Sequence, residues 1–330
     1  MPLSERMRIL DRRQLLRTLA GTLALASVRA VHGLTSKTLT KPGKETHMRT
    51  LTARPLRRID VGEVQLATRL HPGTGVPIVF IHGSFDDHYA WDALCASLPA
   101  AVQQPLLLFD RRGHGASTDQ PGQGRLSDDV ADVAALIRTI AGGSAHVVGH
   151  SYGANVAFAL ASGQPELVAS LVLYEPPLFG LLAPVDEYAA ARESAKQNMQ
   201  RAASLLAAGE IEQGTVMFVE SVAFGAGSWA AFDARTRASM LVNADTWLDQ
   251  SRDPERLNVD VAGLDSFSRA MTLVGGSDSL PMFRGTNEQI RARLGALRYA
   301  QIAGAGHGGI GTHAAALGEV LNAHLAVAVR

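Results

Sequence analysis

A serine stands between two glycines in the run Gly149-His150-Ser151-Tyr152-Gly153. An apolar valine pair precedes this run and several alanines follow it, so we expect a strand, a sharp turn and a helix. Glycines two positions either side of the serine let the strand and the helix approach closely. This spacing favours a serine nucleophile over an incidental serine in a glycine-rich turn. The backbone N–H of Tyr152, at the expected helix start, would then face an oxyanion.

Acyl transfer by a serine also needs a base, and an acid that holds the tautomer of that base. His307 lies in a glycine-rich loop after an expected strand at 297–302, and Asp278 follows an expected strand at 271–274. Groups that act together in an open α/β sheet meet beyond the carboxyl ends of its strands. We therefore expect His307 to be the base and Asp278 the acid. Glu175, which follows another expected strand, is the alternative acid, and a helix cap is the competing role for Asp278.

Two further polar loops follow expected buried strands. His82-Gly83-Ser84 comes after the apolar run 77–81, and the backbone N–H of Ser84 is our candidate for the second oxyanion donor. His82 itself is expected to be structural. The loop Asp110–Ser117 follows the apolar run 105–109, and we expect it to maintain loop geometry.

The elements that must position these residues alternate along the chain. Residues 57–61 and 63–70 flank Gly62 and predict a hairpin, and the later apolar runs are separated by helical patterns. This order predicts an α/β fold with a doubly wound, mostly parallel sheet behind the first hairpin. The alternation stops in residues 178–265, which are expected to form an inserted helical cap between core segments 53–177 and 266–330.

Large apolar side chains in the expected cap are candidates for lining a substrate pocket, although each one could equally pack inside the cap. They are Met199, Met217, Phe218, Phe224, Trp229, Phe232, Met240 and Trp247.

From about Leu56 to Ala326 the chain resembles the α/β-hydrolase superfamily. The resemblance rests on His82-Gly83, on Asp110–Ser117, on the serine motif, and on Asp278 and His307 in that order. It implies Ser151 as nucleophile, His307 as base, Asp278 as orienting acid and no cofactor. The serine argues against the branches that use an aspartate nucleophile.

The expected function is hydrolysis of a small carboxylic ester or related acyl substrate through an acyl-enzyme. Carbon–carbon bond hydrolases of this fold are one alternative. They usually continue the first motif, which is His82-Gly83 here, with Gly-Pro-Gly, whereas in this chain Phe85-Asp86-Asp87 follows Ser84. Cofactor-free haloperoxidases or perhydrolases are another alternative. A non-catalytic ligand-binding protein of the same fold is a third, but such proteins commonly lose a triad member.

The N-terminal region differs from the rest of the chain. Arg12-Arg13 precedes a short apolar run and small residues, a pattern that resembles a twin-arginine export signal. We expect residues 1–30 to be this signal, residues 31–52 to be a linker, and the protein to be periplasmic or secreted. The alternative is a misassigned start, with Met48 as the first residue of a cytoplasmic protein.

Composition excludes several other classes. The chain has 31 basic and 31 acidic residues, so nothing favours a nucleic-acid partner, and the N-terminal apolar run is too short for stable membrane insertion. Cys95 is the only cysteine, which excludes an intrachain disulfide and a cysteine-based metal site. His313 and His324 are expected on helix faces and not as metal ligands. Oligomeric state is not readable from the sequence.

Overall fold

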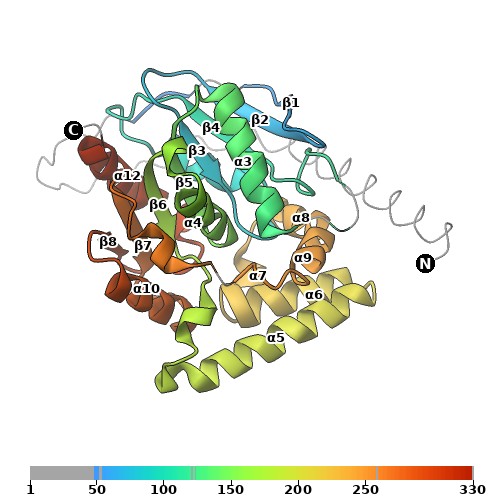
Figure 1. Ribbon diagram of the computed structural model, residues 1–330. Coiled ribbons are helices and arrows are strands. Elements are labelled where there is room, and N and C mark those ends of the chain that lie inside the picture. The colour runs from blue at the N-terminus through green and yellow to red at the C-terminus, as the bar shows by residue number, and fades with distance from the viewer. Residues whose placement is uncertain (1–47, 52–53, 120–121, 123, 258, 329–330) are drawn as a thin grey trace, which may run out of the picture.

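A computed structural model describes residues 48–51, 54–119, 122, 124–257 and 259–328. Its centre is an eight-stranded sheet in the order β1-β2-β4-β3-β5-β6-β7-β8 (Figure 1). The hairpin strands β1 and β2 run antiparallel to each other, β2 runs antiparallel to β4, and the remaining neighbours are parallel. The predicted mostly parallel sheet behind an antiparallel hairpin is confirmed. The strands are β1 (Arg57–Asp60), β2 (Gln65–His71), β3 (Ile78–Ile81), β4 (Leu106–Phe109), β5 (Ala145–His150), β6 (Val168–Tyr174), β7 (Met271–Gly276) and β8 (Arg298–Ile302).

Helices cover both faces of this sheet, which explains why the central strands are continuously apolar. On one face lie α3 (Leu126–Ile140), α4 (Tyr152–Gly163) and α10 (Pro281–Arg293). On the other lie α2 (Asp92–Ala96), α11 (Gly309–Thr312) and α12 (Ala314–Ala328). Short helical turns, η1 (His88–Trp91) and η2 (Pro165–Leu167), complete the core.

The segment between β6 and β7 is helical and gathers at one end of the sheet (Figure 1). It packs on the loops that follow β3 and β4, because Asn243 donates to the carbonyl of Phe85 and Thr246 donates to that of Gly113. These loops lie at the carboxyl ends of the strands, so the cap covers the edge where the polar residues were expected. Its elements are η3 (Phe179–Leu182), η4 (Asp186–Tyr188), α5 (Ala189–Ala207), α6 (Ile211–Phe218), the π-helical η5 (Val219–Ala223), α7 (Ser228–Ala231), α8 (Ala234–Val242), α9 (Ala244–Gln250) and η6 (Val261–Leu264).

Residues 48–51, which we expected to belong to a linker, pack on the core. Met48 pairs with Pro99, and the Arg49 guanidinium donates to the carbonyls of Val102, Gln104 and Pro72 at 2.7–3.0 Å. The expected signal at 1–30 and residues 31–47 lie outside the described residues. In the described part of the chain, no helix is both long enough and apolar enough to cross a membrane.

Candidate active site

Ser151 occupies the turn between β5 and α4, with φ of 53° and ψ of −125°. Such left-handed backbone is unfavourable for a residue with a side chain and persists only where the surroundings enforce it. The flanking glycines are required sterically. A Cβ on Gly153 would overlap the carbonyls of Ile81 and His82, and one on Gly149 would overlap the first turn of α4. The motif therefore holds the serine at a tight strand-to-helix turn, as its spacing predicted.

His307 connects this serine to a carboxylate. Its Nε2 lies 2.9 Å from Ser151 Oγ, and its Nδ1 lies 2.8 Å from Glu175 Oε2. Both His307 and Glu175 are buried, with 3% and 0% of their surfaces exposed. The three side chains form one continuous hydrogen-bonded line in which the serine can lose a proton to an imidazole held by an acid.

The carboxylate in this line is that of Glu175, so the assignment of Asp278 as orienting acid is corrected. Strand β7 extends to Gly276, two residues further than its apolar run indicated. Asp278 consequently lies in the exposed turn beyond it, where its carboxylate accepts from the Ser277 hydroxyl at 2.7 Å. An exposed carboxylate is solvated and cannot fix a ring inside a buried site.

Glu175 is held by groups from the neighbouring strand end. Its Oε1 accepts from the backbone N–H of Gly276 at 2.8 Å and from the hydroxyl of Ser279. These donors hold Oε1 in place and leave Oε2 to accept from His307. Glu175 has a φ of 48°, so it too sits in a strained turn. No sequence signal marked Ser279 as part of the site.

Aromatic and polar neighbours fix the loop that carries His307. The Phe283 ring stacks on the imidazole with centroids 3.8 Å apart. The His150 Nε2 lies 2.9 Å from the backbone oxygen of His307, and the Tyr174 hydroxyl donates to that of Gly306 at 2.7 Å. Burial and the nearby His307 ring lower the pKa of His150 well below its usual value, so this ring stays neutral. These contacts position His307 and were not anticipated from the sequence.

The two oxyanion candidates both lie beside the serine. Tyr152 is the first residue of α4, so its N–H is among those with no acceptor inside the helix. The loop bearing Ser84 passes so close that a Cβ on the preceding Gly83 would lie 3.1 Å from the Ser151 Cβ. The Ser84 hydroxyl donates to Gln250 Oε1 at 2.8 Å, which ties this loop to the cap. The structure therefore brings both residues together with Ser151.

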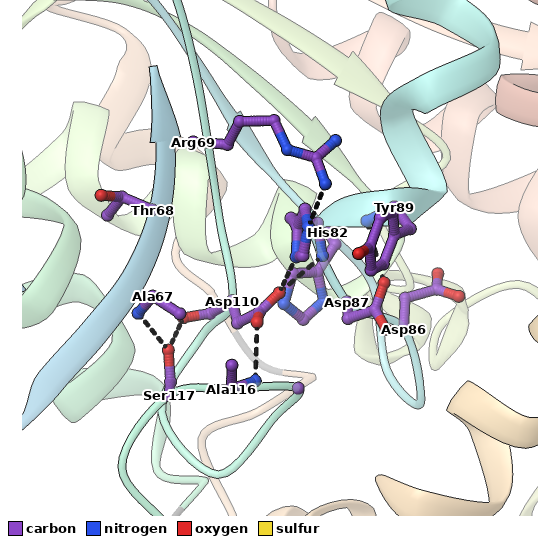
Figure 2. Close-up of polar contacts among 12 residues, drawn as sticks. Ala67, Thr68, Arg69, His82, Asp86, Asp87, Tyr89, Asp110, Ala116 and Ser117 are labelled. Carbon is purple, nitrogen blue, oxygen red and sulfur yellow. Dashed lines mark hydrogen bonds and ion pairs between the residues drawn. The ribbon is translucent and has the colours of Figure 1, made fainter. Parts of the chain in front are cut away.

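The polar loops upstream support this arrangement, as expected for His82 and for the Asp110–Ser117 loop (Figure 2). The Nε2 of His82 accepts from the backbone of Arg111 at 2.9 Å. Asp110 accepts from the backbone N–H groups of His88 and Ala116, each at 2.8 Å, and lies 2.5 Å from the His88 Nδ1. The contacts with backbone N–H groups fix the course of these loops.

Asp87, His88 and Asp110 are also close enough to one another to suggest a metal site. The geometry argues against a metal, because the His88 Nε2 already faces the Arg69 guanidinium at 2.7 Å. With Nδ1 directed to Asp110, the His88 ring has no nitrogen left to ligate an ion. His313 and His324 serve other contacts: His324 lies between the Thr272 and Ser170 hydroxyls, and His313 lies beside Thr312.

A small cavity of about 30 Å³ lies between the cap and Ser151. Of the expected pocket residues, Met199, Phe218 and Trp247 line it, together with Phe179 and Phe283. Phe224, Phe232 and Met240 line a different cavity of about 470 Å³ on the other side of His307, beside Asp86 and His150. Met217 and Trp229 pack against the apolar cluster inside the cap. The space at the serine is therefore small and lined mostly by apolar side chains.

Comparison with known proteins gives matches over most of the chain. Residues 78–320 match the family described as "Alpha/beta hydrolase family". A 2-(acetamidomethylene)succinate hydrolase from Mesorhizobium japonicum is 38% identical over 117 residues, which is 35% of this chain and 41% of that protein. Lipase LipV from Mycobacterium tuberculosis is 34% identical over 108 residues, 33% of this chain and 40% of that one. The matches thus span less than half the length of these relatives.

Solved structures agree at the level of the fold. A hydrolase from Pseudomonas aeruginosa superposes with a TM-score of 0.68 and 23% identity, covering 82% of this chain and 98% of that one. The crystal structure of E-2-(acetamidomethylene)succinate hydrolase superposes with a TM-score of 0.59 and 21% identity over 84% and 99% of the two chains. At these identities the similarity concerns the fold alone.

Proposed function

Because the chain belongs to the alpha/beta hydrolase family, we propose that it is a serine hydrolase that cleaves small carboxylic esters through an acyl-enzyme. The observation that carries the proposal is the hydrogen-bonded line from Ser151 through His307 to Glu175. Relatives named as a lipase and an esterase are consistent with it, while others are named as a succinate-derivative hydrolase and a bromoperoxidase.

The proposed reaction begins when Ser151 Oγ attacks the ester carbonyl carbon and its proton passes to His307 Nε2. The carbonyl oxygen becomes an oxyanion, which the backbone N–H groups of Ser84 and Tyr152 stabilise. His307 then protonates the leaving alcohol as the acyl-enzyme forms. A water gives a proton to His307 Nε2 while its oxygen attacks the acyl carbon. The bond to Ser151 Oγ then breaks, the acid leaves, and His307 returns the proton to Ser151 Oγ. Glu175 remains ionised throughout and holds the His307 Nδ1–H.

The size of the cavity at the serine suggests which acyl groups fit. Phe218, Trp247 and Phe283 are among the side chains that close it, and its volume is about 30 Å³. A long acyl chain would need these aromatic side chains to move, whereas a short one needs little rearrangement. We therefore expect acetate and propionate esters to be better substrates than esters of octanoate or longer acids.

A panel of 4-nitrophenyl esters of increasing acyl length, supplemented with lactones, tests the proposal. Wild-type protein should hydrolyse the short esters, and Ser151→Ala should lower turnover by a factor on the order of 10⁶. Retention of a tenth of the wild-type activity in Ser151→Ala would disprove the serine mechanism. A preference for long chains would disprove the short-acyl assignment alone.

A further inference from the structure

Arg256, on the loop between α9 and η6, contributes to two cavities at once. It lines the small cavity at Ser151, and it also lines a larger cavity of about 490 Å³ beside α5. The two cavities share four wall residues, Phe179, Met199, Arg256 and Leu257. The guanidinium therefore stands where the space next to the nucleophile adjoins the larger space outside it.

Among the residues that the structure describes, this guanidinium forms no direct ion pair, although the Asp253 carboxylate lies near enough to attract it. Its closest hydrogen-bond contact is the weak acceptor Met199 Sδ at 3.9 Å, and it lies 5.9 Å from the centre of the Trp247 ring. Burial lowers the pKa of Arg256 from its usual value. The hydrogen bonds that Asp253 accepts come from the backbone N–H groups of Leu126 and Glu255, at 2.7 and 3.0 Å, and not from Arg256. A partly desolvated guanidinium with such weak partners is costly unless a ligand supplies an anion.

The larger cavity adds two more cations. Arg192 and Lys196 lie one turn apart on α5 and line it together with Glu193 and Asp253. Within the described residues, neither cation forms an ion pair. The Arg192 guanidinium donates to the carbonyl of Ala183. Three cations against two carboxylates leave this lining with one excess positive charge. That balance suits a singly charged anion better than a doubly charged one.

We infer that Arg256 selects substrates that carry a carboxylate on the leaving group, a conclusion that rests on the proposed ester hydrolysis. A planar guanidinium binds a carboxylate through two parallel N–H···O bonds, a geometry that a lysine cannot reproduce. The short acyl group occupies the small cavity at Ser151, and the charged leaving group extends past Arg256 into the larger cavity. The substrate class is therefore short-chain acyl esters of hydroxy acids.

Two matched substrates test this selectivity, 4-acetoxybenzoate with a carboxylate and 4-nitrophenyl acetate without one. In Arg256→Gln, kcat/KM for 4-acetoxybenzoate should fall about 10- to 100-fold further than for the neutral ester, mainly through KM. Arg256→Lys should recover part of this loss. Arg252→Gln, which changes an exposed arginine on the same loop, should leave the ratio unchanged. Equal losses on both esters in Arg256→Gln would overturn the inference.

Binding to an inactive protein separates this inference from the proposed function. Calorimetric titration of Ser151→Ala with 4-acetoxybenzoate should give saturable binding, and adding Arg256→Gln should weaken it about 10- to 100-fold. Binding that does not change with Arg256, or no binding at all, overturns the inference. If wild-type protein hydrolyses neither ester while Arg256-dependent binding is present, the proposed esterase function fails and the anion site stands.

Discussion

At the scale of single residues, backbone strain is concentrated at the candidate site. Three non-glycine residues in the described ranges have positive φ, namely Phe85, Ser151 and Glu175, at 64°, 53° and 48°. They follow β3, β5 and β6, the strands whose ends carry the candidate oxyanion loop, the candidate nucleophile and the candidate acid. Strained backbone of this kind is maintained by surrounding structure and is common where side chains must be aimed.

The choice between Glu175 and Asp278 shows what the sequence could decide at this scale. Both carboxylates follow an apolar run, so strand position alone allowed either one. The decision depends on β7 continuing through Gly275 and Gly276, which places Asp278 beyond the site, and on Glu175 accepting a left-handed turn. Neither property is visible in local residue patterns. Ser151 and His307, by contrast, stand in glycine-rich loops whose spacing is informative.

Substitution of the acid gives a direct prediction. Glu175→Gln should leave the protein folded and lower kcat by roughly 10³- to 10⁴-fold, because the amide no longer fixes the productive His307 tautomer. Asp278→Asn, the matched change at the rejected position, should leave kcat close to the wild-type value. Steady-state kinetics on a short-chain ester, with circular dichroism to verify folding, would measure both. A larger loss in Asp278→Asn than in Glu175→Gln would return the role to Asp278.

At the scale of elements, long-range contacts set details that local patterns could not predict. Ser127 is of a residue type that favours the position before a helix, but α3 already begins at Leu126. The backbone N–H of Leu126 donates to the Asp253 carboxylate, which lies 127 positions away in the chain. A residue of the cap domain thus satisfies the backbone at the N-terminus of the core helix α3. The alternation of strands and helices along the chain and the helical character of the cap were predictable because both follow from hydrophobic periodicity.

The contact between α3 and the oxyanion loop is expected to be important for stability. Arg111 donates to Asp129 at 2.8 Å and to the carbonyls of His82 and Gly83 at 3.2 and 3.1 Å, with both charged side chains 1% exposed. Asp129→Ala would leave a buried guanidinium unpaired, so the free energy of unfolding should fall by about 3–5 kcal/mol. Urea denaturation measures this loss. Asp128→Asn, on the more exposed side of the same helix, should cost less than about 1 kcal/mol; equal losses would contradict the assignment.

At the scale of the whole molecule, the packing of the cap on the core buries a titratable group. Asp86 follows the oxyanion loop, with its Oδ2 3.9 Å from His150 Nδ1. Burial, and secondarily the Asp87 carboxylate, raise the pKa of Asp86 to about 7 from a usual 3.8. The folded protein therefore holds this proton more tightly than the unfolded chain does. The contribution of Asp86, considered by itself, therefore lowers the free energy of unfolding as the pH rises from about 4 to 7.

Asp86→Asn should remove that dependence. The quantity to compare is the free energy of unfolding of the variant minus that of wild type. This difference should be more positive at pH 8 than at pH 4, by on the order of 3 kcal/mol. Urea denaturation of both proteins at the two pH values measures the change. Asp265→Asn, at an exposed position in the same chain, should show no such difference. A gain for Asp86→Asn that is equal at both pH values would show that Asp86 ionises normally in the folded protein.

The central claim, that Ser151 is a nucleophile activated by His307, is tested most directly by covalent labelling. The full-length protein is treated with a fluorophosphonate, digested and mapped by mass spectrometry. We predict a single phosphonylated residue, Ser151, because among the serines that the structure describes its Oγ alone is paired with a histidine held by a buried carboxylate. Absence of an adduct on Ser151, or an adduct on another serine in its place, would contradict the account.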